Sequence, residues 1–447
     1  MIEWYMLRKL EYYKQFLNVD LLRRGYFTDK YFVHIREIFS KLKKDPSNVL
    51  NHPQNQAGIL PQDYFVPDAE VEMQWFTRRP GHTIIAGIEL ALACIKYCSG
   101  YWQDGIFIDT SDELAVWAVD EGSIQPYSGR PDEVTPILRV QGKYKDFGIN
   151  ETVTLGYLTR ASRVATNVYQ LLEATGGKPT MFFPARYDIP EAQRVDGLAY
   201  ATAINTYNQT HHTSLIPFVS TDAQGEFINQ RGGGTIPHAA IACFLGNTVD
   251  TTLAFAEFVS PEIKRVALVD YENDCVGTSI AVAKAFYDRY CIAVQQNNEE
   301  DIKRYTLFAV RLDTSSALRD VSVPDTGNAA DDNGVNPQLV FLVRQGLDSA
   351  WEKWNLPDNE VALAQTFCRS IQIVASGGFT VEKIKRFESA NAPVDIYAVG
   401  SATFDNHGPT ITDFTADVVK VKVGGQWMPM AKIGRRANEN PTLKRIW

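Results

Sequence analysis

The sequence of 447 residues lacks the features that would assign it at once to a secreted or a membrane class. Its six cysteines form no Cys-x-x-Cys pair, which fits reduced, structural thiols. Its longest apolar stretch, residues 84–98, contains Glu89 and Lys96 and is shorter than the ~20 residues that span a bilayer. Residues 1–16 mix charged and apolar side chains and do not resemble a signal peptide. These absences predict a cytoplasmic protein that does not enter a membrane.

An excess of positive charge is also missing. The formal net charge is −9 and the basic residues are scattered, which argues against a broad nucleic-acid-binding surface. An anionic small substrate is still compatible with this charge, because a local basic pocket can exist in an acidic protein. No group of histidines or cysteines has the spacing of metal ligands, so the sequence predicts no metal site made by the protein alone.

What the sequence does contain is enough apolar material for more than one core. Hydrophobic residues make up 45% of the chain and charged residues 22%, as in ordinary soluble proteins. Since single cores usually stop growing near ~250–300 residues, we expect more than one domain. We assign residues 1–165 to an N-terminal α+β domain and residues 166–409 to an α/β domain, and we expect residues 410–447 to return to the first.

Local patterns in the first domain predict several elements. Residues 81–98 carry apolar side chains at helical spacing, and a long helix begins near Glu151. In the tail, residues 417–436 alternate valine and lysine around a Gly-Gly pair, which is typical of a half-exposed antiparallel hairpin.

Polar residues follow the strand-like segments of the second domain. From about Met181, apolar segments alternate with helical patterns, which predicts a parallel sheet covered by helices, in an α/β barrel or a doubly wound sheet. In either architecture, functional groups lie at the carboxyl ends of the strands. The polar or small residues that follow these segments are Asp270, Asp274, Arg311, Asp313, Ser376, Gly377, Gly378, Gly400 and Ser401.

Two of these strand ends carry small residues at matched positions. They are Ser376-Gly377-Gly378 and Gly400-Ser401, on consecutive strand and helix units. Backbone amides of both loops can converge on one phosphate group. Each loop alone also fits an ordinary turn, but the matched pair favours a phosphate site.

Two further strand ends combine an arginine with a second functional side chain. Arg311 can hold a carboxylate or a diphosphate. Asp313 can accept hydrogen bonds from sugar hydroxyls or bind a ligand that carries Mg²⁺. The alternative is that these two residues only form a salt bridge with each other. Phe183 can stack on a flat heterocycle whose carboxylate Arg186 neutralises, although a core phenylalanine beside a surface arginine explains the same residues.

A lone histidine follows a run of three glycines. His238 comes directly after Pro237, and the apolar residues after it predict a buried helix with the proline at its first position. At a helix N-terminus the neutral, nucleophilic imidazole is favoured. The alternative is a structural histidine.

Taken in order, several motifs resemble those of the nicotinate phosphoribosyltransferases, in particular the archaeal-like branch of the type II phosphoribosyltransferases. The motifs are RRGYFTDKYF, ETVTLGYLTRASRVAT, FFPARYD, GTIPHA, VDYEND, VRLDTSS, IVASGGF and VDIYAVGSATF, with a tail ending in AKIGRR. Together they span nearly the whole chain.

The resemblance implies an irregular α/β barrel and an N-terminal α+β sandwich domain that the C-terminal tail completes. It implies a homodimer in which the partner's N-terminal segment completes each active site. The implied reaction is a glycosyl transfer of NAD salvage, in which nicotinate and phosphoribosyl pyrophosphate give nicotinate mononucleotide and pyrophosphate. The resemblance also implies Mg²⁺ as cofactor and coupling to ATP hydrolysis through a phosphohistidine.

The resemblance also assigns roles to residues by their place in the motifs. Phe183 and Tyr31 match the two aromatic partners of the pyridine ring, with Tyr31 contributed across the dimer. Arg311 and Asp313 match residues near the base, the diphosphate and the ribose. The remaining substrate-binding residues are Arg186, Asp270 and, in the loops for the 5′-phosphate, Ser376, Gly377, Gly378, Gly400 and Ser401.

His238 matches the phospho-accepting histidine of the family, and the glycines before it are interpreted as a tight turn that presents it. Two departures concern the base, because Pro184 and Tyr187 stand where the family usually has glycine and arginine. Two alternatives therefore stay open. The chain transfers the phosphoribosyl group to nicotinamide or another base, or it is a catalytically silent paralogue that binds a phosphosugar.

Overall fold

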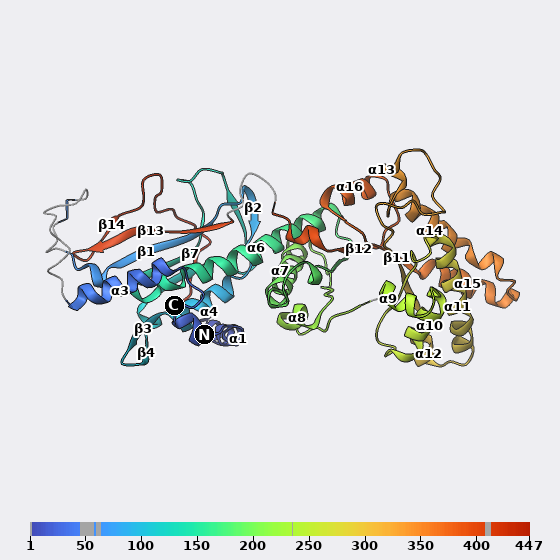
Figure 1. Ribbon diagram of the computed structural model, residues 1–447, viewed down its shortest axis with the longest axis horizontal. Coiled ribbons are helices and arrows are strands. Elements are labelled where there is room, and N and C mark those ends of the chain that lie inside the picture. The colour runs from blue at the N-terminus through green and yellow to red at the C-terminus, as the bar shows by residue number, and fades with distance from the viewer. Residues whose placement is uncertain (1, 45–57, 60–63, 235, 407–412) are drawn as a thin grey trace. The chain divides into compact units, whose positions relative to one another are not determined.

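The chain forms two compact units in the computed structural model, which describes residues 2–44, 58–59, 64–234, 236–406 and 413–447 (Figure 1). Unit 1 comprises Met1–Thr166, Leu198–Thr206 and Asn406–Trp447, and unit 2 comprises Asn167–Gly197 and Tyr207–Asp405. The predicted boundary between residues 409 and 410 lies outside the described residues. Two long helices, α6 (Glu151–Ala174) and α7 (Gln193–His211), each contribute residues to both units.

Unit 1 is built on a six-stranded sheet in the order β14-β13-β1-β7-β5-β15. Its strands are β1 (Glu70–Thr77), β5 (Ala115–Ala118), β7 (Pro136–Lys143), β13 (Phe414–Val423), β14 (Gln426–Pro429) and β15 (Lys444–Arg445). Strand β13 pairs antiparallel with β1, so the C-terminal tail returns to the N-terminal domain as predicted. Gly424 and Gly425 both have positive φ and connect β13 to β14, which is the backbone geometry of a two-residue hairpin turn.

Helices and short hairpins complete unit 1. Helix α6 begins at Glu151, as predicted, and its Thr154 accepts a hydrogen bond from the indole of Trp75 on β1 at 3.1 Å. The prediction of one helix over residues 81–98 is wrong at its start, because a strand and the positive-φ residue Gly87 precede the helix. The other elements are α1 (Ile2–Lys14), α2 (Val19–Arg23), α3 (Lys30–Lys44), α4 (Ile88–Cys98), α5 (Tyr144–Phe147), β2 (Gly81–Ile84), β3 (Gly100–Gln103), β4 (Ile106–Asp109) and β6 (Ile124–Tyr127).

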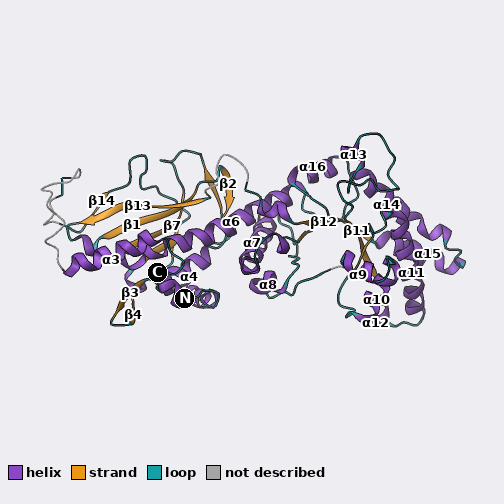
Figure 2. Cartoon of the chain, viewed as in Figure 1, coloured by secondary structure: helices purple, strands orange, loops and turns teal. Residues whose placement is uncertain are grey.

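Unit 2 contains a five-stranded parallel sheet in the order β8-β12-β11-β10-β9. Its strands are β8 (Thr180–Phe182), β9 (Arg265–Leu268), β10 (Leu307–Leu312), β11 (Gln372–Ala375) and β12 (Ile396–Val399). The predicted alternation of strand and helix is confirmed from β9 onward (Figure 2). The helices are α8 (Asp222–Gly225), α9 (His238–Cys243), α10 (Thr248–Phe258), α11 (Cys275–Gln295), α12 (Glu299–Arg304), α13 (Ala329–Asp332), α14 (Pro337–Ser349), α15 (Asp358–Ser370) and α16 (Val381–Ser389).

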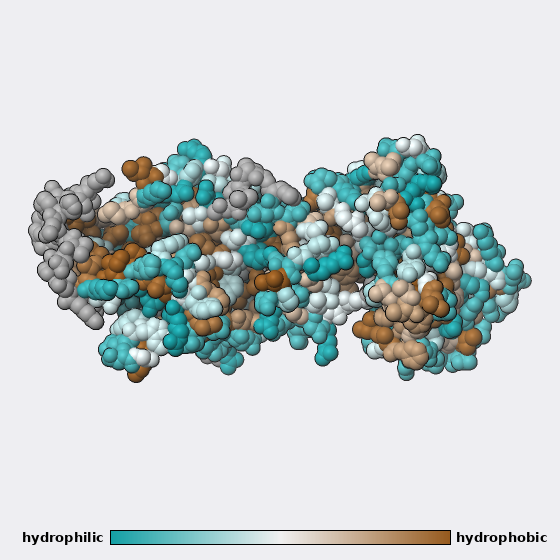
Figure 3. Space-filling view, viewed as in Figure 1, coloured by the Kyte–Doolittle hydropathy of each residue, from teal (hydrophilic) through white to brown (hydrophobic). Residues whose placement is uncertain are grey.

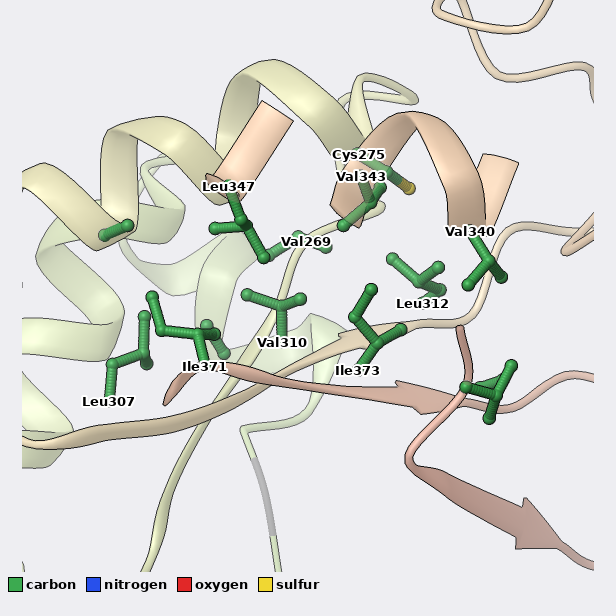
Figure 4. Close-up of a cluster of buried hydrophobic side chains, with 14 of the residues drawn as sticks. Val269, Cys275, Leu307, Val310, Leu312, Val340, Val343, Leu347, Ile371 and Ile373 are labelled. Carbon is green, nitrogen blue, oxygen red and sulfur yellow. The ribbon is translucent and has the colours of Figure 1, made fainter. Parts of the chain in front are cut away.

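The two faces of the parallel sheet bury different clusters. On the outer face, Val310, Leu312 and Ile373 pack with Val343 and Leu347 of α14 in the main core of the unit (Figure 4). On the inner face, alternate residues of the same strands form a smaller cluster, as the two-residue period of a strand requires. Its buried members are Met181, Val266, Ala309, Val374, Ile396 and Ala398.

The predicted α/β class is confirmed, but the described strands do not form a closed barrel. Within the described residues, the edge strands β8 and β9 are not paired with each other. Beyond β8, Phe182 forms an isolated parallel bridge with Val219, and the amide of Gly233 donates to the carbonyl of Val219 at 2.8 Å. Loop segments therefore extend the sheet past its edge.

None of the helices in the described part of the chain combines the length and hydrophobicity of a membrane-spanning segment.

Candidate functional site

The polar residues at the strand ends share the inner face of the parallel sheet. Because side chains alternate along a strand, a residue two positions beyond an inner-face residue points the same way. The inner-face positions nearest the strand ends are Met181, Ala309, Val374 and Ala398. Two positions further along the same strands stand Phe183, Arg311, Ser376 and Gly400.

These strand ends border a cavity of about 370 Å³. This volume lies in the range of roughly 300–1,000 Å³ that small-molecule sites occupy. The predicted site residues that line the cavity are Phe183, Arg186, Arg311, Asp313, Ser376, Gly377, Gly378, Gly400 and Ser401. The structure therefore brings residues from the ends of β8, β10, β11 and β12 to one place.

Both glycine loops line this cavity. Gly377 and Gly378 have φ of +97° and +66°, a region that glycine adopts far more readily than other residues. At Gly400, an added Cβ would lie 2.7 Å from the ring of Tyr187, so a close approach requires glycine. The backbone amides of Gly377, Gly378 and Ser401 donate no hydrogen bond to another described residue. Such amides at the ends of adjacent strands are suitable donors for a phosphate group.

Arg311, Asp313 and Ser376 form a hydrogen-bond network at the cavity wall. Arg311 donates from Nε to Ser376 Oγ and from Nη2 to Asp313 Oδ2, both at 2.9 Å. The Ser376 hydroxyl lies 2.8 Å from both Asp313 Oδ1 and the carbonyl of Leu312, and it donates to one of them. The salt bridge considered as the alternative is therefore present, and it also fixes the guanidinium at the cavity.

Phe183 supplies an aromatic face beside this guanidinium. The Cζ atom of Arg311 is 5.6 Å from the centre of the Phe183 ring, and Phe218 packs against that ring at 5.9 Å between centroids. Arg186 lies in the turn after β8, where a hydrogen bond to the Tyr187 hydroxyl raises its pKa. A flat ring stacked on Phe183 would therefore share the cavity with two guanidinium groups.

His238 and Asp270 form a pair of their own and do not line the cavity, although Pro237 does. The Nε2 atom of His238 is 3.0 Å from each carboxylate oxygen of Asp270. Burial raises the pKa of Asp270, and the neighbouring imidazole opposes that shift. With an Nε2 proton held by Asp270, Nδ1 is the nitrogen that carries the lone pair.

The helix that carries His238 differs from its prediction. Helix α9 has six residues, Pro237 is its N-cap with φ −83° and ψ 154°, and Ile241 is its one buried residue. Cys243, expected to be a buried structural thiol, is exposed. Alanines make up half of α9, and alanine favours helix whether it is buried or exposed, so this pattern does not determine burial.

The three glycines before His238 do not form the predicted tight turn. None of Gly232, Gly233 and Gly234 has a positive φ. Instead, Gly232 and Gly233 permit close packing, because an added Cβ would lie 2.6 Å from the backbone of Thr221 at Gly232 and 2.7 Å from the ring of Phe218 at Gly233. Gly233 and Gly234 also line the cavity. These contacts are long-range, so local sequence does not reveal them.

Three further residues lie at other places. Tyr31 belongs to unit 1, on α3, where its side chain is 59% exposed and its hydroxyl is 3.3 Å from Asp29 Oδ2. Asp274 caps the amino terminus of α11. Lys383 on α16 was not among the predicted site residues, yet its ammonium donates to the carbonyl of Gly377 at 2.7 Å. The one local signal was its position just after the glycine loop.

The described residues contain no cluster of three or more histidine, cysteine, aspartate or glutamate side chains arranged to hold a metal ion. Asp313 nevertheless presents a carboxylate at the cavity, and Mg²⁺ in proteins commonly uses one or two carboxylates together with substrate phosphates. The cavity suits a phosphorylated molecule with a flat, acidic ring. Its residues are suited to positioning the phosphate and the ring, and not to abstracting a proton.

Comparisons with known proteins agree with this fold. No protein-family model matches the chain. Among solved structures, it is similar to a nicotinate-nucleotide pyrophosphorylase from Pyrococcus furiosus, with a TM-score of 0.61 and 24% identity over 95% of this chain and 81% of that one. It is also similar to human nicotinic acid phosphoribosyltransferase, with a TM-score of 0.51 and 15% identity over 90% of this chain and 75% of that one. The predicted resemblance is thereby confirmed for the fold.

Proposed function

We propose that this protein is an enzyme that transfers a phosphoribosyl group from phosphoribosyl pyrophosphate to nicotinate, giving nicotinate mononucleotide and pyrophosphate. One observation carries the proposal. A single cavity combines the Phe183 ring and the Arg186 guanidinium with the backbone amides of Gly377, Gly378 and Ser401, which donate to no other described residue. A nucleotide with an acidic pyridine ring needs both parts, the first for its base and the second for its 5′-phosphate. The fold shared with the two proteins above supports the same class of reaction.

The chemistry needs positioning more than proton transfer. The pyridine ring stacks on Phe183 with its carboxylate near Arg186, while the glycine loops hold the 5′-phosphate. The ring nitrogen then lies close to ribose C1 and attacks with its own lone pair as the bond from C1 to the pyrophosphate oxygen breaks. Arg311 balances the charge of the departing pyrophosphate, and Asp313 accepts a hydrogen bond from a ribose hydroxyl. No general base is required.

Asp313 would hold Mg²⁺ on the protein side, and the bound ion would supply positive charge for the diphosphate. We further propose that ATP hydrolysis is coupled through His238. Its Nδ1 attacks the γ-phosphorus of ATP, ADP leaves, and water later releases phosphate from the phosphohistidine. Asp270, 3.0 Å from Nε2, supports this role because it holds the proton on the other nitrogen.

We also propose a cytoplasmic homodimer in which Tyr31 of the partner subunit covers the pyridine ring. The support is the exposure of aromatic side chains on unit 1. Tyr26 is 66% exposed, Phe27 50% and Tyr31 59%. Clustered exposed aromatics are typical of interface cores.

The reaction is tested with the purified full chain, phosphoribosyl pyrophosphate and Mg²⁺, with and without ATP. Nicotinate and nicotinamide compete in one mixture, a pyridine dicarboxylate is tested in a separate one, and the nucleotides formed are measured by mass spectrometry. We expect nicotinate mononucleotide and an equal amount of pyrophosphate. Preference for nicotinamide would favour the neutral-base alternative. No nucleotide from any pyridine would contradict the proposal, and thermal stabilisation by ribose 5-phosphate without turnover would favour the silent paralogue.

Base recognition is tested with Arg186→Ala. Loss of a charge-assisted pair should lower kcat/KM for nicotinate about tenfold or more and leave that for nicotinamide nearly unchanged. Arg289→Ala, on the exposed side of α11, is the matched control. Equal losses for both bases would show that Arg186 does not read the carboxylate.

A further inference from the structure

Lys383, on helix α16, contacts the loop of Gly377, Gly378 and Phe379 that follows β11. Its Nζ atom donates to the carbonyl of Gly377 at 2.7 Å and lies 4.4 Å from the centre of the Phe379 ring. The two contacts bracket Gly378, the middle residue of the loop. Phe379 is 2% exposed and itself lines the cavity, so the lysine rests on a fixed platform.

The contact from Lys383 fixes the orientation of the peptide unit between Gly377 and Gly378. The peptide bond between Gly377 and Gly378 is trans and planar, so the Gly377 carbonyl and the Gly378 amide point in opposite directions. Among the hydrogen bonds of the described residues, the bond from Lys383 is the one that holds this carbonyl. Two consecutive glycines would otherwise let the peptide plane rotate freely. Holding the carbonyl on one side therefore fixes the direction of the amide on the other.

The groups around Lys383 shift the pKa of its ammonium. Burial lowers the pKa of its ammonium to about 8, the Arg386 guanidinium acts in the same direction, and the Asp313 carboxylate opposes it. Arg386 is itself paired with Asp331 of α13 at 2.6 Å. Lys383 therefore keeps its proton at neutral pH and loses it under mildly alkaline conditions.

We propose that Lys383 is a positioning residue of the phosphate loop, which orients the Gly378 amide toward the 5′-phosphate of the phosphosugar. The identity of that ligand rests on the proposed function, whereas the orientation of the loop does not. The lysine acts through the Gly377 carbonyl, so its removal weakens phosphate binding and leaves the aromatic half of the cavity intact.

The test compares Lys383→Met, Lys383→Arg and the control Lys385→Met, which removes an exposed lysine from the same helix. Binding of ribose 5-phosphate and of inorganic phosphate is measured by calorimetry. Loss of a hydrogen bond from a charged donor should weaken ribose 5-phosphate binding about tenfold in Lys383→Met. Lys383→Arg should restore most of the affinity, and Lys385→Met should match the wild type. In steady state, Lys383→Met should raise KM for phosphoribosyl pyrophosphate and leave KM for nicotinate unchanged.

A pH series separates positioning from a merely structural role. Wild-type affinity for ribose 5-phosphate should fall as pH rises through about 8, while Lys383→Arg should keep its affinity, because arginine stays charged. A flat wild-type profile, or wild-type affinity in Lys383→Met, would overturn the proposal. The wild-type profile needs no variant, so a Lys383→Met chain that fails to fold does not remove the test. If ribose 5-phosphate binding depends on Lys383 but no pyridine is converted, the proposed reaction fails and the loop assignment stands.

Discussion

At the scale of single residues, Arg311 joins two strand ends and the aromatic face of the cavity. It bonds Ser376 at the end of β11 and Asp313 at the end of β10, and it lies beside Phe183. A planar guanidinium can serve all three directions at once, whereas the single ammonium of lysine cannot. We therefore expect Arg311→Lys to lower kcat/KM for phosphoribosyl pyrophosphate about tenfold or more. Steady-state kinetics check this, and unchanged constants would show that charge alone suffices.

The backbone of Gly377 gives a second residue-scale prediction, on stability. Its φ of +97° disfavours any side chain, although an added Cβ would meet no atom closer than 3.6 Å. Gly377→Ala should therefore lower the free energy of unfolding by about 1–2 kcal/mol through backbone strain alone. Gly234→Ala is the matched control, because that position has neither a positive φ nor a neighbour within 4 Å. Equal denaturant midpoints for the two variants would refute this reading of the loop.

His238 is expected to act in ATP coupling and not in glycosyl transfer, since it lies outside the cavity lining. His238→Ala should keep slow formation of nicotinate mononucleotide and lose its stimulation by ATP. Asp270→Asn should reduce that stimulation, because asparagine cannot stabilise the imidazole in the same way. The ratio of rates with and without ATP measures both effects. Full stimulation in His238→Ala would exclude the phosphohistidine.

At the scale of elements, a carboxylate controls the start of helix α4. Glu121 accepts hydrogen bonds from the amides of Gly87 at 2.8 Å and Glu89 at 3.4 Å. Burial, together with the charge of Glu89, raises the pKa of Glu121 to about 7. Between roughly pH 4.5 and 7 the folded chain thus holds a proton that the unfolded chain has released, so stability falls as pH rises through this window.

The direction of this pH dependence can be checked by calorimetry between about pH 5 and pH 8. The unfolding free energy of the chain should decrease by at most a few kcal/mol across that range. Glu151, whose pKa burial raises to about 8, contributes in the same direction. Glu121→Gln should make the dependence shallower, because glutamine carries no proton to lose. A slope that is identical in wild type and Glu121→Gln would contradict the assignment.

Sequence patterns predicted the elements whose signals are local. The strands of unit 2 and their polar ends follow from apolar runs that stop at Asp, Arg or Gly, and the hairpin after β13 follows from Gly424-Gly425. Features set by distant contacts were not predictable in this way. Gly232 packs against Thr221 and Gly233 against Phe218, and Lys383 was not predicted as a site residue because its partner is a backbone carbonyl.

At the scale of the whole molecule, the proposed site needs two copies of the chain. Hydrophobic side chains gather over α3 of unit 1 on the face seen in Figure 3, and Tyr31 and Ile38 of this helix are exposed. If Tyr31 of the partner subunit completes each site, Tyr31→Ala and Asp313→Ala should each be nearly inactive alone. Refolding them together should restore about a quarter of wild-type activity, because half of the dimers are hybrids with one intact site. Activity no higher than that of the separate variants would contradict shared sites.

A crystal structure of the full chain with nicotinate mononucleotide tests the proposed site most directly. We expect the phosphate oxygens to lie within hydrogen-bond distance of the amides of Gly377, Gly378 and Ser401, and the pyridine ring to stack on Phe183. A nucleotide bound elsewhere in the chain, or a phosphate held by other groups, would contradict it.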